Sequence, residues 1–392
     1  MGCYKVMWPQ NTIDTITYNS FKNQISRLNN LNRKIYIWGA GVRGILCAMV
    51  LQEEGINFQA FIDSDSQKHK ETLNGYRIIG VEEIDLPSSF IIVTMENNKT
   101  VVRKLYECGL SETIDYLCLN TNVDIEYVKK IMEDKENLIV GSSLCAGVPY
   151  SDKCWKSIQD ILADNKSIAC AGISCLSMKL IYYSLLTRCE KSKKLKNFMF
   201  LFSWENVLPF GHLLPRTQKP MLLKCLLNEL LESKYAGDLV NEIKEEIELA
   251  EVRSENYEFE NIYSPQRINN AGIDLEYARN SILASFEESC EEVNYLRKLS
   301  EYLLKNKIQC FFIIEPINHE LANELLGEKF YEEYGLKVQK LQNYLKQFSW
   351  HVYDASYLFG QSEYEGINSF YEGLMFSGRK KLTDKMLYLL EN

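Results

Sequence analysis

Basic residues are in short supply in this 392-residue chain. Lysine and arginine together number 44, against 53 aspartates and glutamates, which leaves a formal net charge of −9. A protein that binds nucleic acid or an anionic membrane broadly needs a basic face that replaces counterions. The charge balance therefore argues against such a protein and allows only a local basic groove.

Metal-ligand patterns are also missing. The chain has only four histidines, and its 12 cysteines form no CxxC pair and no Cys/His cluster at zinc spacing. Most of the cysteines stand inside apolar runs, as reduced core residues do. The sequence therefore predicts no metal site and no disulfide framework.

Long apolar runs are absent too. No segment approaches the roughly 20 apolar residues of a membrane-spanning helix. The first residues, Met1 to Ser20, lack the charged, apolar and small-residue regions of a secretory signal. We therefore expect a cytoplasmic protein with no membrane span.

Short apolar runs alternate with helical stretches in the first third of the chain. Strands are expected at 34–38, 57–62, 90–94 and 114–119, and helices at 43–54 and 98–108. Strands that alternate with helices predict a mostly parallel sheet. The chain length favours two domains.

A second α/β series starts at Asn137. Its expected strands are 138–140, 167–170, 198–202, 310–314 and 351–353, each followed by small or polar residues, with a helical insertion at about 219–307. Ligands of open α/β sheets bind beyond the carboxyl ends of the strands, so these residues should converge. The predicted fold is α/β throughout: a lead segment (1–30), a small Rossmann-like parallel-sheet domain (31–122), a helical connector (123–136) and a larger flavodoxin-like domain (137–392).

A glycine-rich turn, Gly39-Ala-Gly-Val-Arg-Gly44, follows the first expected strand. In this GxGxxG pattern the first glycine permits the turn, the second lets a phosphate approach the backbone, and the third lets helix and strand pack closely. Asp63 lies 22 residues beyond the second glycine, Gly41. An acidic residue at that distance binds a ribose hydroxyl in dinucleotide-binding folds.

The segments KIYIWGAGVRG, AFIDSDSQK and NGYRIIG resemble the small nucleotide-binding modules fused to bacterial surface-polysaccharide enzymes, such as the N-terminal domains of hexapeptide sugar acetyltransferases. The resemblance implies a nucleotide or nucleotide-sugar ligand. The alternative is a scaffold of Rossmann shape that binds nothing, and a nicotinamide oxidoreductase is disfavoured because residues 34–122 hold no Tyr-x-x-x-Lys pair. The implied pocket residues are Gly39, Gly41, Arg43, Gly44, Asp63 and Ser64.

The turn Gly141-Ser142-Ser143, after the run LIV, resembles the first block of the SGNH-hydrolase superfamily. The stretch Glu315-Pro-Ile-Asn318, the long helix expected after it and the stretch Val352-Tyr-Asp-Ala-Ser356 resemble the end of the branch of that superfamily that assists teichoic-acid D-alanylation. The resemblance implies Ser143 as nucleophile, with Gly172 donating an N–H to the oxyanion and Asn206 as a loose match to the oxyanion asparagine. A plainer role for both serines is to cap a helix.

The final SGNH block departs from that pattern. The family ends in Asp-x-x-His, whereas this chain has Glu372 and Met375 there. Glutamate can orient a base, but methionine has no proton-accepting nitrogen. Other histidines that could replace the base are His212, His319 and His351, of which His319 follows a strand end. Arg379, in the run Phe376 to Lys381, could hold a phosphate or carboxylate at a helix start, but the plainer expectation is a solvated, basic helix end.

Two functions follow from these patterns. The first is an O-acyltransferase or acyl-esterase of cell-surface glycan biosynthesis that uses Ser143, with Glu372 as orienting acid and a glycan and an acyl-donor small molecule as partners. The second is a catalytically inactive SGNH-fold binding or scaffold protein that carries a nucleotide-binding module.

Overall fold

The computed structural model describes residues 12–28, 33–95, 98–121, 123–149, 152, 154–207, 215–235, 237–254, 283, 286–364 and 373–391. The chain divides into two compact units. Unit 1 is built mainly of Ile16–Asn122, and unit 2 of Val123–Asn392 together with Pro9–Thr15. Residues 9–15 and the predicted connector thus group with unit 2.

Unit 1 holds a six-stranded sheet. Its strands are β2 (Lys34–Trp38), β3 (Phe61–Ile62), β4 (Thr72–Leu73), β5 (Tyr76–Ile79), β6 (Ser89–Val93) and β7 (Tyr116–Cys118). The strand order is β4-β5-β3-β2-β6-β7, and all neighbours are parallel except the β4–β5 hairpin. From β5 to β7 this is the order 3-2-1-4-5, which reverses between β2 and β6. The ends of β2 and β6 therefore flank the switch point of the sheet.

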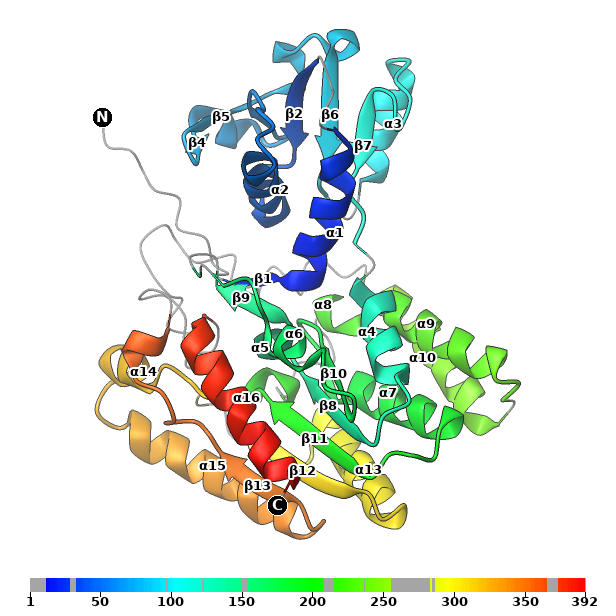
Figure 1. Cartoon of the computed structure of the whole chain (residues 1–392), viewed down its shortest axis with the longest axis vertical. Helices are drawn as coiled ribbons and strands as arrows, with labels where there is room; N and C mark the ends of the chain where they lie inside the picture. Colours follow the sequence, from blue (N-terminus) through cyan, green and yellow to red (C-terminus); the bar gives the residue numbers. More distant parts are fainter. Residues whose placement is uncertain are drawn as a thin grey trace. The chain divides into compact units, whose positions relative to one another are not determined.

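Three helices accompany this sheet: α1 (Thr15–Ile25), α2 (Val42–Glu53) and α3 (Lys99–Glu107). Short 3-10 turns lie at Ser26–Leu28, Ser66–Lys70, Val81–Glu83 and Leu86–Ser88. Helix α3 buries Val101 and Leu105 against the strands, beside Trp38 and Val93. Figure 1 shows α2 and α3 in blue and cyan beside β2 and β6.

Unit 2 holds a five-stranded sheet in which all neighbours are parallel. Its strands are β8 (Asn137–Gly141), β10 (Ile168–Gly172), β11 (Asn197–Phe202), β12 (Gln309–Ile314) and β13 (His351–Asp354). The order β10-β8-β11-β12-β13 is the doubly wound order 2-1-3-4-5. A separate two-stranded ribbon pairs β1 (Thr12–Asp14) with β9 (Gly147–Pro149) antiparallel.

The helices of unit 2 are α4 (Val123–Met132), α5 (Ser143–Ala146), α6 (Ile158–Leu162), α7 (Met178–Lys191), α8 (Pro215–Gln218), α9 (Pro220–Glu232), α10 (Asp238–Ser254), α13 (Glu291–Lys305), α14 (His319–Leu326), α15 (Phe330–Lys346) and α16 (Phe376–Glu391). Short 3-10 turns lie at Trp204–Val207 and Gln361–Glu363. Several helices begin at a side chain that accepts a hydrogen bond from their first turn: Ser157 before α6, Ser177 before α7 and Asn318 before α14. Of the predicted insertion, α9, α10 and α13 are described.

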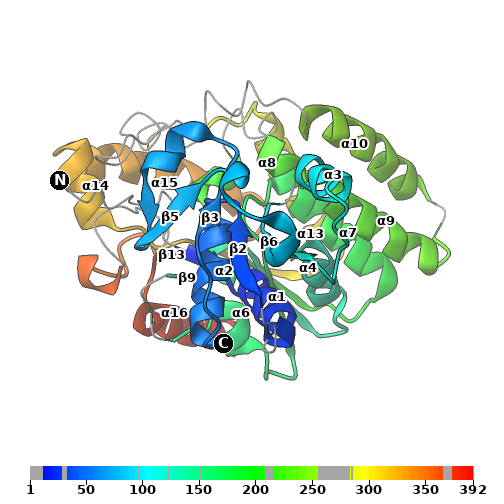
Figure 2. The same cartoon turned by 90° about the horizontal axis from the view of Figure 1, so that it is seen from above.

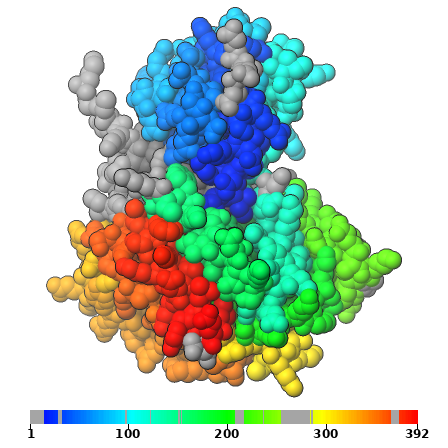
Figure 3. Space-filling model, viewed as in Figure 1, coloured from blue at the N-terminus to red at the C-terminus, as the bar shows by residue number. Residues whose placement is uncertain are grey.

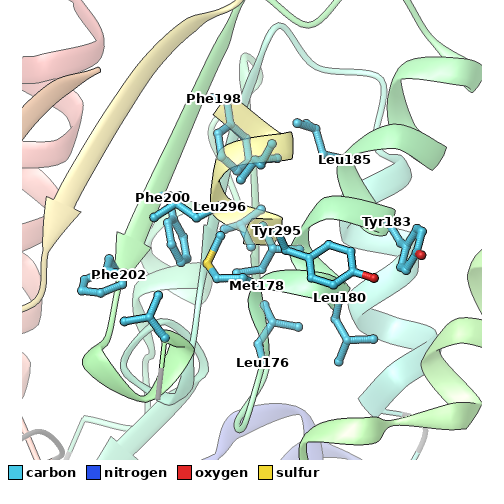
Figure 4. Close-up of a cluster of buried hydrophobic side chains, with 14 of the residues drawn as sticks. Leu176, Met178, Leu180, Tyr183, Leu185, Phe198, Phe200, Phe202, Tyr295 and Leu296 are labelled. Atoms are coloured by element: carbon cyan, nitrogen blue, oxygen red, sulfur yellow. The ribbon is translucent and has the colours of Figure 1, made fainter. Parts of the chain in front are cut away.

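The sheet of unit 2 is covered on both faces, because alternate side chains of a strand point to opposite sides. Phe198, Phe200 and Phe202 of β11 join a large apolar core with α4, α7, α13 and α15. Met199 and Leu201 join a smaller core with α5, α6 and α16. Figure 2 shows α6 and α16 close together and α7 apart from them, and Figure 4 shows the three phenylalanines beside Leu296 and Met178.

The predicted α/β class with parallel sheets is confirmed. Each strand predicted from an apolar run is present, although β3 and β7 are shorter than expected. No helix in the described ranges is long and apolar enough to cross a membrane.

Candidate functional site

Two glycines of the glycine-rich turn are required by the fold itself. Gly39 has a φ of +118°, and a Cβ there would lie 2.6 Å from Oγ1 of Thr94. A Cβ on Gly44 would lie 1.9 Å from the carbonyl oxygen of Gly39. These two residues let β2, β6 and α2 pack closely, so their presence does not by itself indicate a ligand.

Gly41 is different, because nothing in the described part of unit 1 requires a glycine there. It stands immediately before α2 in extended conformation, with a φ of −112°, and a Cβ would meet no atom within 4 Å. Any residue can adopt that backbone. The missing side chain leaves the N-terminus of α2 open to solvent at the switch point of the sheet, where anions bind favourably.

Asp63 lies directly beside the turn, at the end of β3. Its Oδ2 accepts a hydrogen bond from the Ala40 N–H at 3.1 Å and one from the Lys68 ammonium at 3.1 Å. Its Oδ1 accepts from the Asp65 N–H at 3.0 Å. Burial alone would raise the pKa of Asp63, but these donors outweigh it and hold the pKa below its ordinary value. The carboxylate is therefore ionised near neutral pH and fixes the turn.

Arg43 holds strand ends together. Its guanidinium donates to the carbonyl oxygens of Thr94 and Leu119 at 2.5 and 2.9 Å and to Oγ1 of Thr121 at 3.2 Å, and it lies over the ring of Phe21. A phosphate would have to compete with these acceptors for the guanidinium.

Ser64, the last residue of the implied pocket, has an exposed side chain. His69 follows in the next turn, where its Nε2 contacts the Asp63 carbonyl at 2.8 Å.

In unit 2 the predicted convergence of strand ends is present. The register pairs Gly172 with Gly141, and Ile314 with both Phe202 and Asp354, so the carboxyl ends of all five strands lie along one edge. The strand order reverses between β8 and β11. The turn that follows β8 therefore lies at the switch point, where ligands of such sheets bind.

The two serines of this turn differ in access. Ser142 directly precedes α5 and is buried, and its Oγ has no hydrogen-bond partner among the described residues. Ser143 is the first residue of α5, is partly exposed, and its hydroxyl forms no hydrogen bond within the described ranges. Ser143 is thus the accessible serine of the pair.

The expected oxyanion donors are already engaged. The Gly172 N–H donates to Oε1 of Gln159 at 3.3 Å in a buried setting. Asn206 is 2% exposed; its Oδ1 accepts from the Ser203 N–H at 2.8 Å and its Nδ2 donates to the Leu176 carbonyl. Both groups therefore hold the loops of the edge together, and an oxyanion would have to displace these partners.

No histidine in the described part of the chain contacts Ser143. His319 begins α14 and shares a hydrogen bond with Tyr331 at 3.0 Å between Nδ1 and Oη. His351 stacks on Phe311 at the start of β13, the opposite edge of the sheet. Met375 lies just before α16. Glu372 and His212 lie outside the described residues.

The start of α16 corrects the expectation for Arg379. This residue is fully buried rather than solvated, and its guanidinium pairs with Oδ2 of Asp152 at 3.1 Å. Asp152 also accepts from the Phe376 N–H at 2.6 Å. The guanidinium further donates to the carbonyl oxygens of Cys154, Lys156 and Leu374. The arginine therefore binds a carboxylate of the chain itself and fixes the helix that follows Met375.

Residues 31–114 match the family model described as C2185-like, N-terminal. The match lies within unit 1, includes the glycine-rich turn and Asp63, and covers less than half of the chain. No curated protein matches the chain.

Sequence reasoning missed Gln159 and Asp152, which occupy the Gly172 N–H and Arg379. No motif marks either residue, because each acts through a contact that depends on tertiary packing. Within the described ranges no group of three or more His, Cys, Asp or Glu side chains could hold a metal ion.

Proposed function

We propose that the protein binds a nucleotide or nucleotide-sugar at the glycine-rich turn of unit 1, and that unit 2 serves a cell-surface glycan pathway as a binding or scaffold domain without Ser143-dependent turnover. The observation that carries the proposal is the open space at Gly41. Gly39 and Gly44 have steric reasons inside the fold, whereas Gly41 has none. A glycine that the fold does not need, at the start of a helix, suits the approach of a phosphate to the backbone.

Asp63 supports the same ligand. Its carboxylate has several lone pairs, three of which are engaged by Ala40, Asp65 and Lys68, and an ionised carboxylate beside the turn accepts a hydroxyl donor such as a ribose. The Lys68 ammonium beside it adds a positive charge at the same place.

Calorimetric titration of the full chain with UDP, ADP, UDP-glucose and UDP-N-acetylglucosamine tests the proposal. We expect saturable binding of at least one of these nucleotides and weaker binding after Asp63→Ala. The absence of binding by all four would overturn the proposal for unit 1.

The second candidate is an O-acyltransferase or acyl-esterase that uses Ser143. It is favoured by one observation, the placement of a partly exposed serine at the switch point of a doubly wound sheet, two residues after Gly141, which pairs with Gly172. An enzyme of this type needs a base for the hydroxyl proton and free donors for the oxyanion. Reaction of the chain with a serine-directed fluorophosphonate separates the two candidates.

A further inference from the structure

A surface hollow of about 470 Å³ lies in unit 2, between the end of β13 and α16. It is lined by Tyr353, Leu358, Phe359, Gly360, Ser362, Glu363, Lys381 and Lys385. The volume falls in the usual range of small-molecule sites, about 300 to 1,000 Å³. Figure 3 shows α16, in red, on an exposed face of unit 2.

One wall of the hollow is apolar. Leu358 is 41% exposed, Phe359 is buried beneath it, and the ring of Tyr353 is half-buried. These apolar side chains can contact the C–H face of a ligand ring, and they are too few to form an extended hydrophobic patch. Ser362 is exposed and adds a hydroxyl that can donate or accept a hydrogen bond.

The charged side chains that line the hollow are Glu363, Lys381 and Lys385, so the lining carries a net positive charge. Glu363 pairs with Lys381 and accepts a hydrogen bond from Ser377, so those charges cancel. Lys385 has no carboxylate within ion-pair distance in the described part of the chain. Its ammonium instead lies 4.9 Å from the ring centres of both Tyr353 and Tyr388.

The two rings hold the Lys385 ammonium at the hollow without neutralising it, because a cation–π contact leaves the positive charge in place. In a chain with a net charge of −9, a fixed and uncompensated cation in a concave surface favours an anion. A monosaccharide-sized ring with one acidic group fits both walls.

We propose that this hollow binds an acidic sugar, with the oxyanion on Lys385 and the ring against Leu358 and Tyr353. The shared chemistry is an oxyanion on a sugar ring, which a carboxylate or a phosphate can supply. The hollow lies at the carboxyl end of β13, three strands from β8 and about 14 Å from it across the sheet. It is therefore separate from the turn after β8 that carries Ser143.

Saturation-transfer NMR on the full chain with glucuronate, glucose 6-phosphate and glucose tests this proposal. We expect transfer to the ring protons of at least one acidic sugar and none to glucose. Transfer to glucuronate alone assigns a carboxylate ligand, and transfer to glucose 6-phosphate alone assigns a phosphate; both together support an oxyanion site without preference. Transfer to neither acidic sugar, or equal transfer to glucose, overturns the proposal.

Three variants locate the site. Lys385→Gln should weaken the affinity for the acidic sugar at least about tenfold, since a charge-assisted hydrogen bond is lost. Glu363→Gln should strengthen it, because the hollow gains net positive charge. Lys380→Gln, an exposed lysine on the same helix that does not line the hollow, should leave it unchanged. Equal affinities in the Lys385 and Lys380 variants would contradict the assignment.

Discussion

The backbone N–H of Gly172 donates a hydrogen bond to Oε1 of Gln159, with an N–O distance of 3.3 Å. This contact places a side chain of α6 on the N–H group that the SGNH resemblance assigns to the oxyanion. Asn206 is occupied in the same way, by Ser203 and Leu176. The edge beside Ser143 is therefore filled by hydrogen bonds within the chain.

Ser143 should be unreactive. A serine hydroxyl attacks an ester or a fluorophosphonate only when a base removes its proton and donors receive the oxyanion. We expect no covalent adduct of wild type with a fluorophosphonate, as measured by intact-protein mass spectrometry, with an active serine hydrolase as positive control. Stoichiometric labelling that disappears in Ser143→Ala would establish the enzymatic candidate instead.

Gly172→Ala should destabilise unit 2. A Cβ at this position would lie 2.5 Å from Cβ of Cys145 and 2.9 Å from the Ala146 nitrogen, so α5 would have to move. Overpacking of this kind costs about 1 to 3 kcal/mol. The matched control is Gly335→Ala in α15, where a Cβ would meet nothing within 4 Å. This substitution should stabilise the helix by about 0.5 to 1 kcal/mol, because glycine is less favourable than alanine inside a helix. Urea unfolding measures both; a neutral Gly172 variant would show that α5 does not pack as described.

The Asp152–Arg379 pair should be important for stability. Its two side chains are 6% and 0% exposed, so removing either partner leaves a buried charge without its counterion. We expect Asp152→Ala and Arg379→Met each to lower the free energy of unfolding by about 3 to 5 kcal/mol. The exposed pair Lys196–Glu136 is the control, and Lys196→Ala should change stability by less than about 1 kcal/mol. Equal effects at the two pairs would be incompatible with the buried geometry.

The sheets could be predicted because their strands are continuous apolar runs. NLIV before Gly141 and NFMFLF before Ser203 become β8 and β11 with nearly the expected bounds. The convergence of their ends followed from the topology of parallel sheets alone. The offset of Asp63 from Gly41 likewise placed the carboxylate beside the turn.

The occupants of the candidate site could not be predicted in this way. Gln159 and Gly172 are close in sequence, but their hydrogen bond depends on how α6 packs against β10. Arg379 stands in a polar run that is typical of a solvated helix end, and its partner Asp152 is 227 residues away. Such pairings arise from tertiary packing, which no local pattern encodes.

Glu292 should make stability depend on pH. Burial raises its pKa to about 7, against the opposing effects of the Lys179 ammonium and the N–H groups of Lys179 and Met178. The folded state therefore holds a proton between about pH 4.5 and 7 that the unfolded state releases, so the contribution of Glu292 to stability is lost as the pH rises through this window.

Glu292→Gln removes this titration. Relative to wild type, the variant should gain up to about 3 kcal/mol in unfolding free energy between pH 4.5 and pH 8, as measured by urea unfolding at several pH values. Glu291→Gln, one residue earlier on α13, is the control and should show a smaller change. A constant difference between wild type and Glu292→Gln across this range would contradict the shifted pKa.

Gly41 offers the most direct test of nucleotide binding. The test is calorimetric titration with the nucleotide or nucleotide-sugar that binds wild type. It compares wild type with Gly41→Ala, which adds a methyl group in the open space before α2, and with Gly335→Ala, which adds one in α15. The proposal predicts that Gly41→Ala, folded and with a melting temperature near that of wild type, loses at least about tenfold in affinity, whereas Gly335→Ala binds as wild type does. Unchanged affinity in Gly41→Ala would contradict the proposed role of the glycine-rich turn.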